Sequence, residues 1–305
     1  MFDCAIIGGG PAGMAAAVYL ARQKLKFVLI ADMLGGKSMW SADVENYLGF
    51  HLLNGSDLVA HFREHLQDYH DQFELAEGER VERIEKIPGG FRTITQSTSF
   101  ESKTLLIATG TKNRELGVPG EKDYYGKGVT YCATCDAPLF RGKTVHVIGG
   151  GNAAMDAALT LEKYAKKIAI VSTNPALSGD VMLREKVEAS PTITVYPSTK
   201  TTKIQGETFV TAIGLVGKDA EERMEPTDGV FVEIGLTPVS GLIDFVKKDN
   251  RNQIIVDKFN ATDVEGVWAA GDVTDITEKQ IAIAVGEGSK AALGVIRYLQ
   301  SHRTS

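Results

Sequence analysis

One pattern occurs twice in this chain and constrains its fold more than any other feature. Each copy reads as a short apolar strand, a glycine-rich turn, an alanine-rich helix and a second apolar strand. The first copy runs from "FDCAIIGGG" to "KFVLIAD", and the second spans "KTVHVIGGGNAAMDAALTLEKYAKKIAIVST". A buried strand that feeds through such a turn into a helix is typical of a parallel α/β sheet. We therefore expect two α/β domains in one chain.

The turns of both copies are spaced for phosphate binding. The first has the G-x-G-x-x-G spacing at Gly8, Gly10 and Gly13, and the second has G-x-G-x-x-A at Gly149, Gly151 and Ala154. Such a turn lets the backbone approach a pyrophosphate, and the helix that follows offers it free N–H groups. Asp32 ends the second strand of the first copy, where an acid can bind an adenosine ribose. Two such folds predict an oxidoreductase that uses two nucleotides.

Composition and charge exclude several functions. The 305-residue chain is 43% hydrophobic and 24% charged, which suits a globular protein with two cores. Its net charge of −6 disfavours nucleic acid as a partner. Residues 4–21 are uncharged, but Asp3 and three consecutive glycines fit neither a signal peptide nor a membrane span. With three cysteines in all, we expect a reducing compartment, a cytoplasmic location and no membrane association.

Two of the three cysteines lie close together in "GVTYCATCDAPLF", where Cys132 and Cys135 form a C-x-x-C pair. A structural zinc site needs about four ligands, and the remaining cysteine, Cys4, lies inside the first strand. A structural disulfide would close too small a loop to remove much entropy from the unfolded chain. Thiol–disulfide exchange is favoured, because the helix predicted to follow lowers a thiol pKa. Asp136 comes next and is placed either to shuttle protons or to cap that helix.

His61 and His65 are four residues apart within "SDLVAHFREHLQDYHDQF", the spacing of a metal pair on a helix. No third ligand or His-Glu-x-x-His motif accompanies them, so we interpret both as solvated surface residues and expect no metal site. The apolar residues of the same segment predict a stripe that packs on the core, formed by Leu58, Phe62, Leu66, Tyr69 and Phe73.

The order of the motifs resembles that of the low-molecular-weight thioredoxin reductases and of the reductase portion of alkyl hydroperoxide reductase flavoproteins. The matching motifs are "GGGPAG" (8–13), "VENYLGF" (44–50), "ATG" (108–110), "VPGE" (118–121), "YCATCDAPLF" (131–140), "GGGNAA" (149–154) and "AAGDVTD" (269–275). They cover nearly the whole chain in family order, and a C-x-x-C-D element between two dinucleotide folds is highly specific.

The resemblance implies an α/β fold with two Rossmann-like dinucleotide-binding domains, the second inserted into the first. The FAD-binding domain would comprise residues 1–113 and 243–305. The inserted pyridine-nucleotide-type domain, which carries the redox C-x-x-C pair, would comprise residues 114–242. The Gly- and Pro-marked segments "TKNRELGVPGE" and "GLTPVSG" are expected where the chain crosses between the two.

The resemblance also implies which residues bind FAD. Asp272 would bind the ribityl chain, and Asn46, Gln280 and the backbone around Ile281 would lie near the flavin. The implied FAD site is completed by the first glycine turn and by Ala108, Thr109, Gly110 and Gly271. The second glycine turn would bind the nucleotide of the inserted domain. The family commonly has an aromatic residue and an arginine before the glutamine, whereas this chain has Glu278 and Lys279.

For the cysteines, the resemblance implies that Cys135 is the thiol nearer the flavin and that Cys132 attacks the partner's disulfide. In the family the inserted domain rotates about its two crossings, so that the pair meets the flavin and the partner in turn. No thioredoxin-like domain precedes Met1, so we expect a separate acceptor, a small thioredoxin- or glutaredoxin-like protein. The resemblance also implies a homodimer.

The electron donor is where the chain departs from the family. NADPH-dependent members bind the 2′-phosphate with a His-Arg-Arg-x-x-x-Arg element after the second strand of the inserted domain. The corresponding positions hold Ser172, Thr173, Asn174 and Ser178. We therefore expect negligible use of NADPH. Two donors remain equal hypotheses: NADH, with Ser172 and Asn174 at its ribose, and a non-nicotinamide donor such as reduced ferredoxin or a deazaflavin.

Two other functions stay open beside disulfide reduction. An NADH oxidase or diaphorase would pass electrons from the flavin to oxygen or a small acceptor, and the cysteines would be dispensable. A flavin-bearing redox sensor would bind the cofactor without turnover. Titration of the thiols before and after flavin reduction distinguishes a disulfide reductase from both.

Overall fold

The computed structural model describes residues 1–40, 44 and 46–302, and the side chains of Trp40 and Cys135 also lie outside the described part. The "VENYLGF" motif is thus described except at position 45. The chain divides into two compact units. Unit 1 comprises Met1–Lys112 and Thr237–Ser305, and unit 2 comprises Asn113–Leu236.

Unit 1 is built on a seven-stranded sheet with the order β3-β2-β1-β6-β5-β4, in which β17 also pairs with β6. The strands are β1 (Phe2–Ile7), β2 (Phe27–Ala31), β3 (Glu74–Glu77), β4 (Val81–Ile87), β5 (Gly90–Thr95), β6 (Ser99–Ile107) and β17 (Val267–Ala269). All pairs are parallel except those of β5 with β4 and β6. Strands β5 and β4 therefore extend the parallel sheet as an antiparallel edge.

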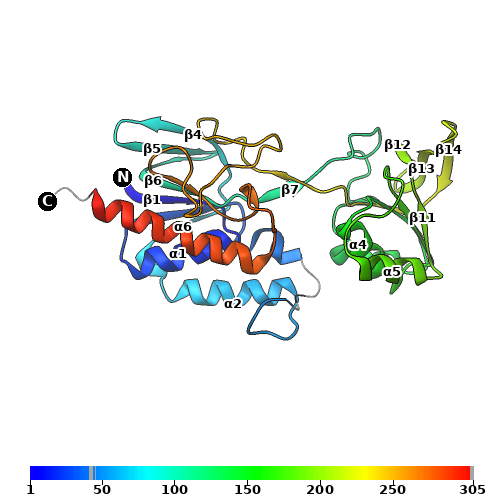
Figure 1. Ribbon diagram of the computed structural model, residues 1–305, viewed down its shortest axis with the longest axis horizontal. Coiled ribbons are helices and arrows are strands. Elements are labelled where there is room, and N and C mark those ends of the chain that lie inside the picture. Colours follow the sequence, from blue (N-terminus) through cyan, green and yellow to red (C-terminus); the bar gives the residue numbers. More distant parts are fainter. Residues whose placement is uncertain (41–43, 45, 303–305) are drawn as a thin grey trace. The chain divides into compact units, whose positions relative to one another are not determined.

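Helices α1 (Pro11–Arg22) and α6 (Ile281–Ser301) lie side by side on one face of this sheet, next to α2 (Gly55–Gln67) (Figure 1). Helices α1 and α6 approach closely because Gly288 on α6 faces the backbone of Ala12 on α1. A Cβ atom on Gly288 would lie 2.0 Å from the Ala12 carbonyl oxygen. Short side chains that are buried line the same seam, among them Ala16, Ala17, Ala291 and Ala292.

Helix α2 is shorter than the predicted apolar stripe. It ends at Gln67, and His70–Gln72 forms a separate 3₁₀ turn. Tyr69 and Phe73 still pack against the core, where Phe73 stacks on Phe27 with 4.9 Å between the ring centroids. The stripe therefore reaches the core, although not from one continuous helix.

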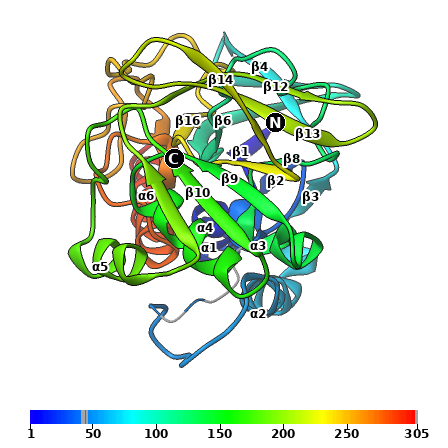
Figure 2. The ribbon, with the colours of Figure 1, turned by 90° about the vertical axis from the view of Figure 1, so that its right-hand side faces the viewer.

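Unit 2 contains a five-stranded parallel sheet with the order β11-β10-β9-β15-β8 and a three-stranded antiparallel sheet, β12-β13-β14. The strands are β8 (Val129–Thr130), β9 (Thr144–Ile148), β10 (Lys167–Val171), β11 (Ile193–Tyr196), β12 (Lys200–Gly206), β13 (Val210–Val216), β14 (Glu222–Pro226) and β15 (Gly229–Val232). The helices are α3 (Ala133–Asp136), the 3₁₀ turn η3 (Ala137–Phe140), α4 (Asn152–Glu162) and α5 (Val181–Ala189). In Figure 2, β9 lies beside β10. Both units thus confirm the expected α/β fold with parallel sheets.

Two short strands carry the chain between the units, β7 (Thr111–Asn113) and β16 (Leu236–Pro238), and they pair with each other. The second crossing lies between residues 236 and 237 rather than near residue 243. The reason is that the chain already bonds within unit 1 at Val239, whose N–H donates to the Gly110 carbonyl at 3.0 Å. The described residues include no helix long and apolar enough to cross a membrane.

Candidate functional site

The first glycine turn joins β1 to α1, and its geometry requires glycine at two positions. Gly8 has a φ of +111°, and a Cβ atom there would lie 2.3 Å from the Ala108 carbonyl oxygen. A Cβ atom on Gly13 would lie 1.9 Å from the Gly8 carbonyl oxygen. At Gly10, by contrast, no described atom lies within 4 Å of the Cβ position. The turn is therefore closed toward the sheet and open at Gly10.

The start of α1 presents unsatisfied amides at this open side. Gly10 is the N-cap residue, no described side chain caps the helix, and the first turn carries no acidic residue. An anion placed there would accept these N–H groups and meet the positive end of the helix dipole. The space at Gly10 and the donors beside it fit the pyrophosphate of FAD.

Asp32 comes directly after β2, at the carboxyl end of the same sheet. Its side chain is 70% exposed, and Oδ2 lies 3.8 Å from the guanidinium of Arg80, which is itself exposed. So loose a surface pair contributes little energy, and the carboxylate stays available to accept hydroxyl groups of an adenosine ribose.

Asp272 lies in the 3₁₀ turn η4 (Gly271–Val273), between β17 and α6. Its Oδ2 forms an ion pair with Lys37 Nζ at 3.0 Å. A second lysine, Lys279, is half-buried and donates to the Thr274 carbonyl at 2.6 Å. Burial lowers the pKa of Lys279, against the opposing charge of Asp272. Sequence reasoning named Asp272 but did not predict its ion pair with Lys37.

Lys37 comes from the 3₁₀ turn η1 (Gly36–Trp40), which packs directly on the first glycine turn. The Gly35 N–H donates to the Gly9 carbonyl at 2.7 Å, and a Cβ atom on Gly36 would lie 3.3 Å from the Gly10 Cα. The sequence did contain a signal for this contact: Lys37 follows two glycines, shortly after the end of β2. The ion pair between Lys37 and Asp272 thus joins the segment packed on the first glycine turn to the residue expected to bind the ribityl chain.

Asn46 and Gln280 were both expected near the flavin, and the structure brings them together. The Asn46 side-chain amide donates to the Gln280 side-chain carbonyl at 3.1 Å. Gln280 is the N-cap residue of α6, and Ile281 is the first residue of that helix, without a side-chain cap among the described residues. The amides at the start of α6 therefore lie beside this pair.

Ala108, Thr109 and Gly110 follow β6 and make contacts that support the turn. The Ala108 N–H donates to the Ile7 carbonyl at 2.7 Å, and the Thr109 hydroxyl donates to the Val239 carbonyl at 2.7 Å. These bonds hold the end of β6 to β1 and to the chain segment that returns from unit 2.

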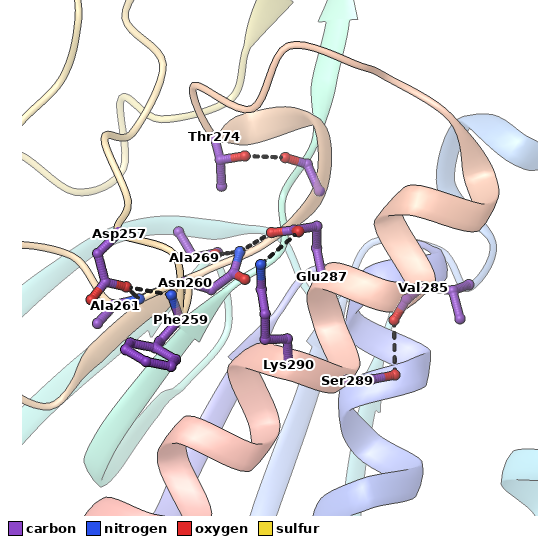
Figure 3. Close-up of polar contacts among 11 residues, drawn as sticks. Asp257, Phe259, Asn260, Ala261, Ala269, Thr274, Val285, Glu287, Ser289 and Lys290 are labelled. Carbon is purple, nitrogen blue, oxygen red and sulfur yellow. Dashed lines mark hydrogen bonds and ion pairs between the residues drawn. The ribbon is translucent and has the colours of Figure 1, made fainter.

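A buried polar cluster fixes α6 against β17 (Figure 3). Asn260 is fully buried, and its Nδ2 donates to the Ala269 carbonyl at 3.0 Å and to the Glu287 carboxylate. Glu287 in turn accepts from Lys290 at 3.0 Å. Loss of one partner would leave a buried polar group unsatisfied, which is costly. The cluster therefore sets the position from which α6 presents Gln280.

The second glycine turn repeats the first in unit 2. Gly149 has a φ of +144°, and a Cβ atom there would lie 2.2 Å from the Glu233 carbonyl oxygen. Ala154 is fully buried, whereas Gly151 has no described atom within 4 Å of its Cβ position. Gly151 is also the N-cap residue of α4, with no side-chain cap in the described structure. The phosphate turn is thus intact.

The loop after β10 carries the four positions where cations would bind a 2′-phosphate. Ser172 is 2% exposed, and its hydroxyl accepts the Asn174 N–H at 3.1 Å. Ser178 donates its N–H to the Gly150 carbonyl at 2.7 Å, so the loop lies back on the glycine turn. No lysine or arginine occurs between residues 172 and 183. The loop therefore supplies no cation for a 2′-phosphate.

The C-x-x-C turn follows β8. Cys132 is disulfide-bonded, whereas Cys4 is a free, fully buried thiol. The side chain of Cys135 lies outside the described residues. The Thr130 hydroxyl donates to Asp136 Oδ2 at 2.5 Å and accepts the Cys132 N–H at 3.1 Å. One threonine thus holds both the backbone of Cys132 and the carboxylate of Asp136.

The alternative expectation for Asp136 was a helix cap. Asp136 ends α3 and precedes η3, and its side chain makes no capping hydrogen bond to η3 within the described structure. Its observed partner is Thr130, on the strand that leads into the cysteine turn. The Asp136 side chain thus bonds to Thr130 and does not cap η3.

The residue before Cys132 is anchored to a buried carboxylate. Glu121, of the "VPGE" motif, is 1% exposed and accepts the N–H groups of Leu116 and Gly117, both at 2.6 Å. It also accepts the Tyr131 hydroxyl at 2.7 Å. The cysteine turn is thereby tied to the segment that enters unit 2, a contact that sequence reasoning missed.

The two histidines of α2 make surface contacts. His61 Nδ1 lies 3.7 Å from the Glu64 carboxylate, and its ring stacks on Phe50. The His65 ring lies against Tyr69. Over residues 1–40, 44 and 46–302, no group of three or more His, Cys, Asp or Glu side chains could hold a metal ion.

Comparison with known proteins identifies the family. The chain belongs to the pyridine nucleotide-disulphide oxidoreductase family, whose model matches residues 2–288. It is 37% identical over 305 residues to a protein named NADH dehydrogenase from Ferdinandcohnia aciditolerans, and the match covers 99% of this chain and 58% of that protein. It is 38% identical over 301 residues to an alkyl hydroperoxide reductase protein from Staphylococcus epidermidis, where the match covers 98% and 59%. The chain thus spans less than two thirds of these relatives.

The solved structures that resemble the chain are thioredoxin reductases. The enzyme from Lactococcus lactis has a TM-score of 0.92 and 31% identity, and the match covers 99% of this chain and 100% of that one. The enzyme from T. acidophilum has a TM-score of 0.87 and 39% identity, with 98% of both chains covered. A ferredoxin-flavin thioredoxin reductase from Clostridium acetobutylicum has a TM-score of 0.54 and 29% identity, again with 98% of both covered. The resemblance expected from the motifs is confirmed.

Proposed function

We propose that this member of the pyridine nucleotide-disulphide oxidoreductase family is a flavin-dependent disulfide reductase. It passes electrons from a donor through FAD to a disulfide between Cys132 and Cys135, and then to a thioredoxin-like protein. The observation that carries the proposal is the disulfide-bonded Cys132 in a turn where Thr130 holds a carboxylate, that of Asp136. A structural cross-link has no use for that carboxylate, whereas thiol exchange needs a group that moves protons.

Unit 1 would hold the FAD. The open turn at Gly10 and the start of α1 would bind the pyrophosphate, and Asp32 the adenosine ribose. Asp272 would bind the ribityl chain in place of its ion pair with Lys37. The positions that shape the pocket around the flavin would be Asn46, Gln280 and Ile281, supported by Gly8, Gly13, Ala108, Thr109, Gly110 and Gly271. When bound, FAD supplies the two-electron chemistry that links donor and disulfide.

The cysteines would have different tasks. Cys135 would face the flavin, and Cys132 would attack the partner's disulfide as a thiolate. Asp136, oriented by the Thr130 hydroxyl, would give protons to the leaving sulfur and take them from the attacking thiol. Rotation of unit 2 about β7 and β16 would present the pair to each partner in turn.

The donor would not be NADPH, because the loop after β10 lacks the cations that a 2′-phosphate needs. Gly149, Gly151 and Ala154 keep a turn that could hold the pyrophosphate of NADH. The relatives named NADH dehydrogenase support NADH, and the ferredoxin-flavin thioredoxin reductase supports a donor without nicotinamide. NADH and a donor without nicotinamide, such as reduced ferredoxin or a deazaflavin, therefore remain two equal hypotheses.

The acceptor would be a small thioredoxin- or glutaredoxin-like protein, since the similar solved structures are thioredoxin reductases by name. We also propose a homodimer and a cytoplasmic location, on the resemblance alone.

Thiol titration tests the proposal. One sample of the FAD-loaded protein is denatured and its thiols are titrated directly. In a second sample the flavin is first photoreduced without oxygen and then reoxidised with a measured, substoichiometric amount of acceptor. The second sample is then denatured and its thiols are titrated. Two additional thiols should appear after reduction, and none should appear in Cys132→Ser. If the wild type gains no thiols, the disulfide takes no part in electron transfer.

A second candidate function follows from the relatives named NADH dehydrogenase, at 37% identity. In a diaphorase the flavin would pass electrons to a small acceptor without the cysteines. A Cys132→Ser variant that keeps full turnover with NADH and a dye acceptor, together with a wild type that releases no thiols, would favour this function.

A further inference from the structure

Glu233 lies between the two loops that the proposed function uses. It directly follows β15, whose neighbours in the sheet are β8 on one side and β9 on the other. β8 leads into the cysteine turn, and β9 leads into the second glycine turn. The register of β15 with β8 pairs Phe231 with Thr130, and two residues further on the two segments reach Glu233 and Cys132.

Both the backbone and the side chain of Glu233 are engaged at this edge. Its N–H donates to the Ile148 carbonyl at 2.7 Å, and its carbonyl packs against Gly149. The half-buried carboxylate accepts the N–H of Ala133, which stands between the two cysteines. The cysteine turn therefore contacts a second carboxyl group, that of Glu233, besides the carboxyl group of Asp136.

The carboxyl group changes its charge near neutral pH. Burial raises the pKa of Glu233 from 4.5 to about 7, against the hydrogen bond from Ala133, and the negative charge of Asp156 on α4 adds to the rise. Asp156 is itself flanked by Asp180 and Lys186, from the start and the interior of α5. A glutamate at this position is thus protonated in part at the pH where thiols and thiolates interconvert.

We propose that Glu233 is a positioning residue that sets whether the reduced Cys132–Cys135 pair is held as a thiol and a thiolate or as two thiols. The inference rests on the proposed function and adds a second carboxyl group beside Asp136. An ionised Glu233 puts a negative charge next to the turn and disfavours a thiolate there, whereas a protonated Glu233 does not. The carboxyl group and the thiols therefore titrate as a coupled set.

The chemistry balances with the electrons that the proposed function supplies. Reduction breaks one S–S bond and consumes two electrons from the reduced flavin. One proton enters when the pair ends as a thiol and a thiolate, and two enter when it ends as two thiols. Attack by Cys132 on the partner's disulfide needs the thiolate. Protonated Glu233 thus favours transfer to the partner, and ionised Glu233 favours the dithiol.

The test is the pH dependence of thiol alkylation in the chemically reduced, FAD-loaded full-length protein. Iodoacetamide reacts with thiolates, and Cys4 stays silent because it is fully buried and burial raises its thiol pKa to about 12. In Glu233→Gln the alkylation profile should move to lower pH. A shift of about one pKa unit would raise the thiolate fraction about tenfold on the acid side.

Two further variants keep the test decisive. Glu207→Gln removes the same charge at an exposed position of unit 2 and should leave the profile unchanged. Asp156→Asn keeps Glu233 but removes the negative neighbour that raises its pKa. Glu233 then ionises at lower pH, so the alkylation profile should move to higher pH, by a smaller amount than the opposite shift in Glu233→Gln. If Glu233→Gln fails to fold, Asp156→Asn and Glu233→Asp carry the comparison.

Profiles of Glu233→Gln and Asp156→Asn that superimpose on those of the wild type and Glu207→Gln would overturn the proposal. The measurement uses a chemical reductant, so it reports on Glu233 even when flavin reduction releases no thiols. Failure of the proposed function and failure of this inference are therefore separate outcomes.

Discussion

The Asn46 side-chain amide donates a hydrogen bond to the Gln280 side-chain carbonyl at 3.1 Å, although the two residues are 234 positions apart. One lies in a loop that follows the first strand–helix–strand unit, and the other caps the C-terminal helix of unit 1. The contact joins the two chain segments that the family resemblance places near the flavin. The start of α6 is thereby tied to the loop that contains Asn46.

Asn46→Ala should weaken FAD retention, because the start of α6 loses this tether. The pair is exposed, and a hydrogen bond of this kind contributes about 0.5–1 kcal/mol, which corresponds to a rise of about two- to fivefold in the dissociation constant for FAD. Quenching of FAD fluorescence on reconstitution of the apoprotein measures it. Asn46→Ala and Gln280→Ala should have effects that do not add; additive effects would show that the two side chains act separately.

Asp272→Ala should yield mostly colourless protein, because the variant loses the proposed bond to the ribityl chain of FAD. Lys37→Gln removes the same ion pair but keeps the carboxylate, so it should retain most of the FAD. Asp244→Ala, at an exposed position of the same unit, serves as the control. The ratio of flavin to protein absorbance reports the occupancy, and full occupancy in Asp272→Ala would contradict the assignment.

The two cysteine variants should differ in colour as well as in activity. Both Cys132→Ser and Cys135→Ser should stop disulfide reduction and keep FAD. Only Cys132→Ser should show a long-wavelength absorption band, because it leaves the Cys135 thiolate beside the oxidised flavin. A band that appears in Cys135→Ser instead would reverse the order of the two sulfurs.

NADPH should not bleach the flavin at micromolar concentration. Each charged contact to a 2′-phosphate is worth about 1.5–3 kcal/mol, so the loss of several costs orders of magnitude in affinity. Anaerobic mixing with NADPH, NADH and reduced ferredoxin, followed by flavin absorbance, ranks the donors. The triple variant Thr173→Arg, Asn174→Arg, Ser178→Arg should gain a response to NADPH if the second glycine turn binds nicotinamide nucleotides at all.

Gly288→Ala should destabilise unit 1 by about 1–3 kcal/mol, because the new methyl group meets the Ala12 carbonyl at the crossing of α1 and α6. Gly286→Ala is a matched control on the same helix, since no described atom lies within 4 Å of its Cβ position. It should stabilise the helix by roughly 0.5–1 kcal/mol. Urea unfolding followed by circular dichroism compares the two, and equal midpoints would exclude a tight helix crossing.

The backbone of the site could be predicted from the sequence because local spacing decides it. Gly13 is required by its contact with the Gly8 carbonyl inside one strand–turn–helix unit, and Gly8 and Gly149 have the positive φ values of the two turns. Gly8 and Gly149 also meet the carbonyls of Ala108 and Glu233 at the ends of other strands, which the spacing alone does not encode. Burial patterns likewise indicated the sheet strands, because parallel strands covered on both faces are continuously apolar.

Side-chain partnerships could not be predicted in the same way. The ion pair between Lys37 and Asp272 depends on how a turn after β2 meets a turn after β17, and no periodicity encodes that. The bond from Tyr131 to Glu121 and the contact of Glu233 with Ala133 join segments that are far apart in the sequence of unit 2. Helix α2 also ended earlier than its apolar pattern, because Tyr69 and Phe73 reach the core from a turn and a strand start.

The pairing of β7 with β16 means that unit 2 could be excised from the chain and the two segments of unit 1 rejoined. Neighbouring strands lie about 4.8 Å apart, so the chain leaves unit 1 and returns to it at nearly the same point. A short splice from Lys112 to Thr237 would therefore close unit 1 without stretching it, and the excised stretch would carry its own sheet, helices and cysteine turn. Such an arrangement lets an entire redox module be gained, lost or exchanged as a cassette while the flavin-type fold around it keeps its connectivity.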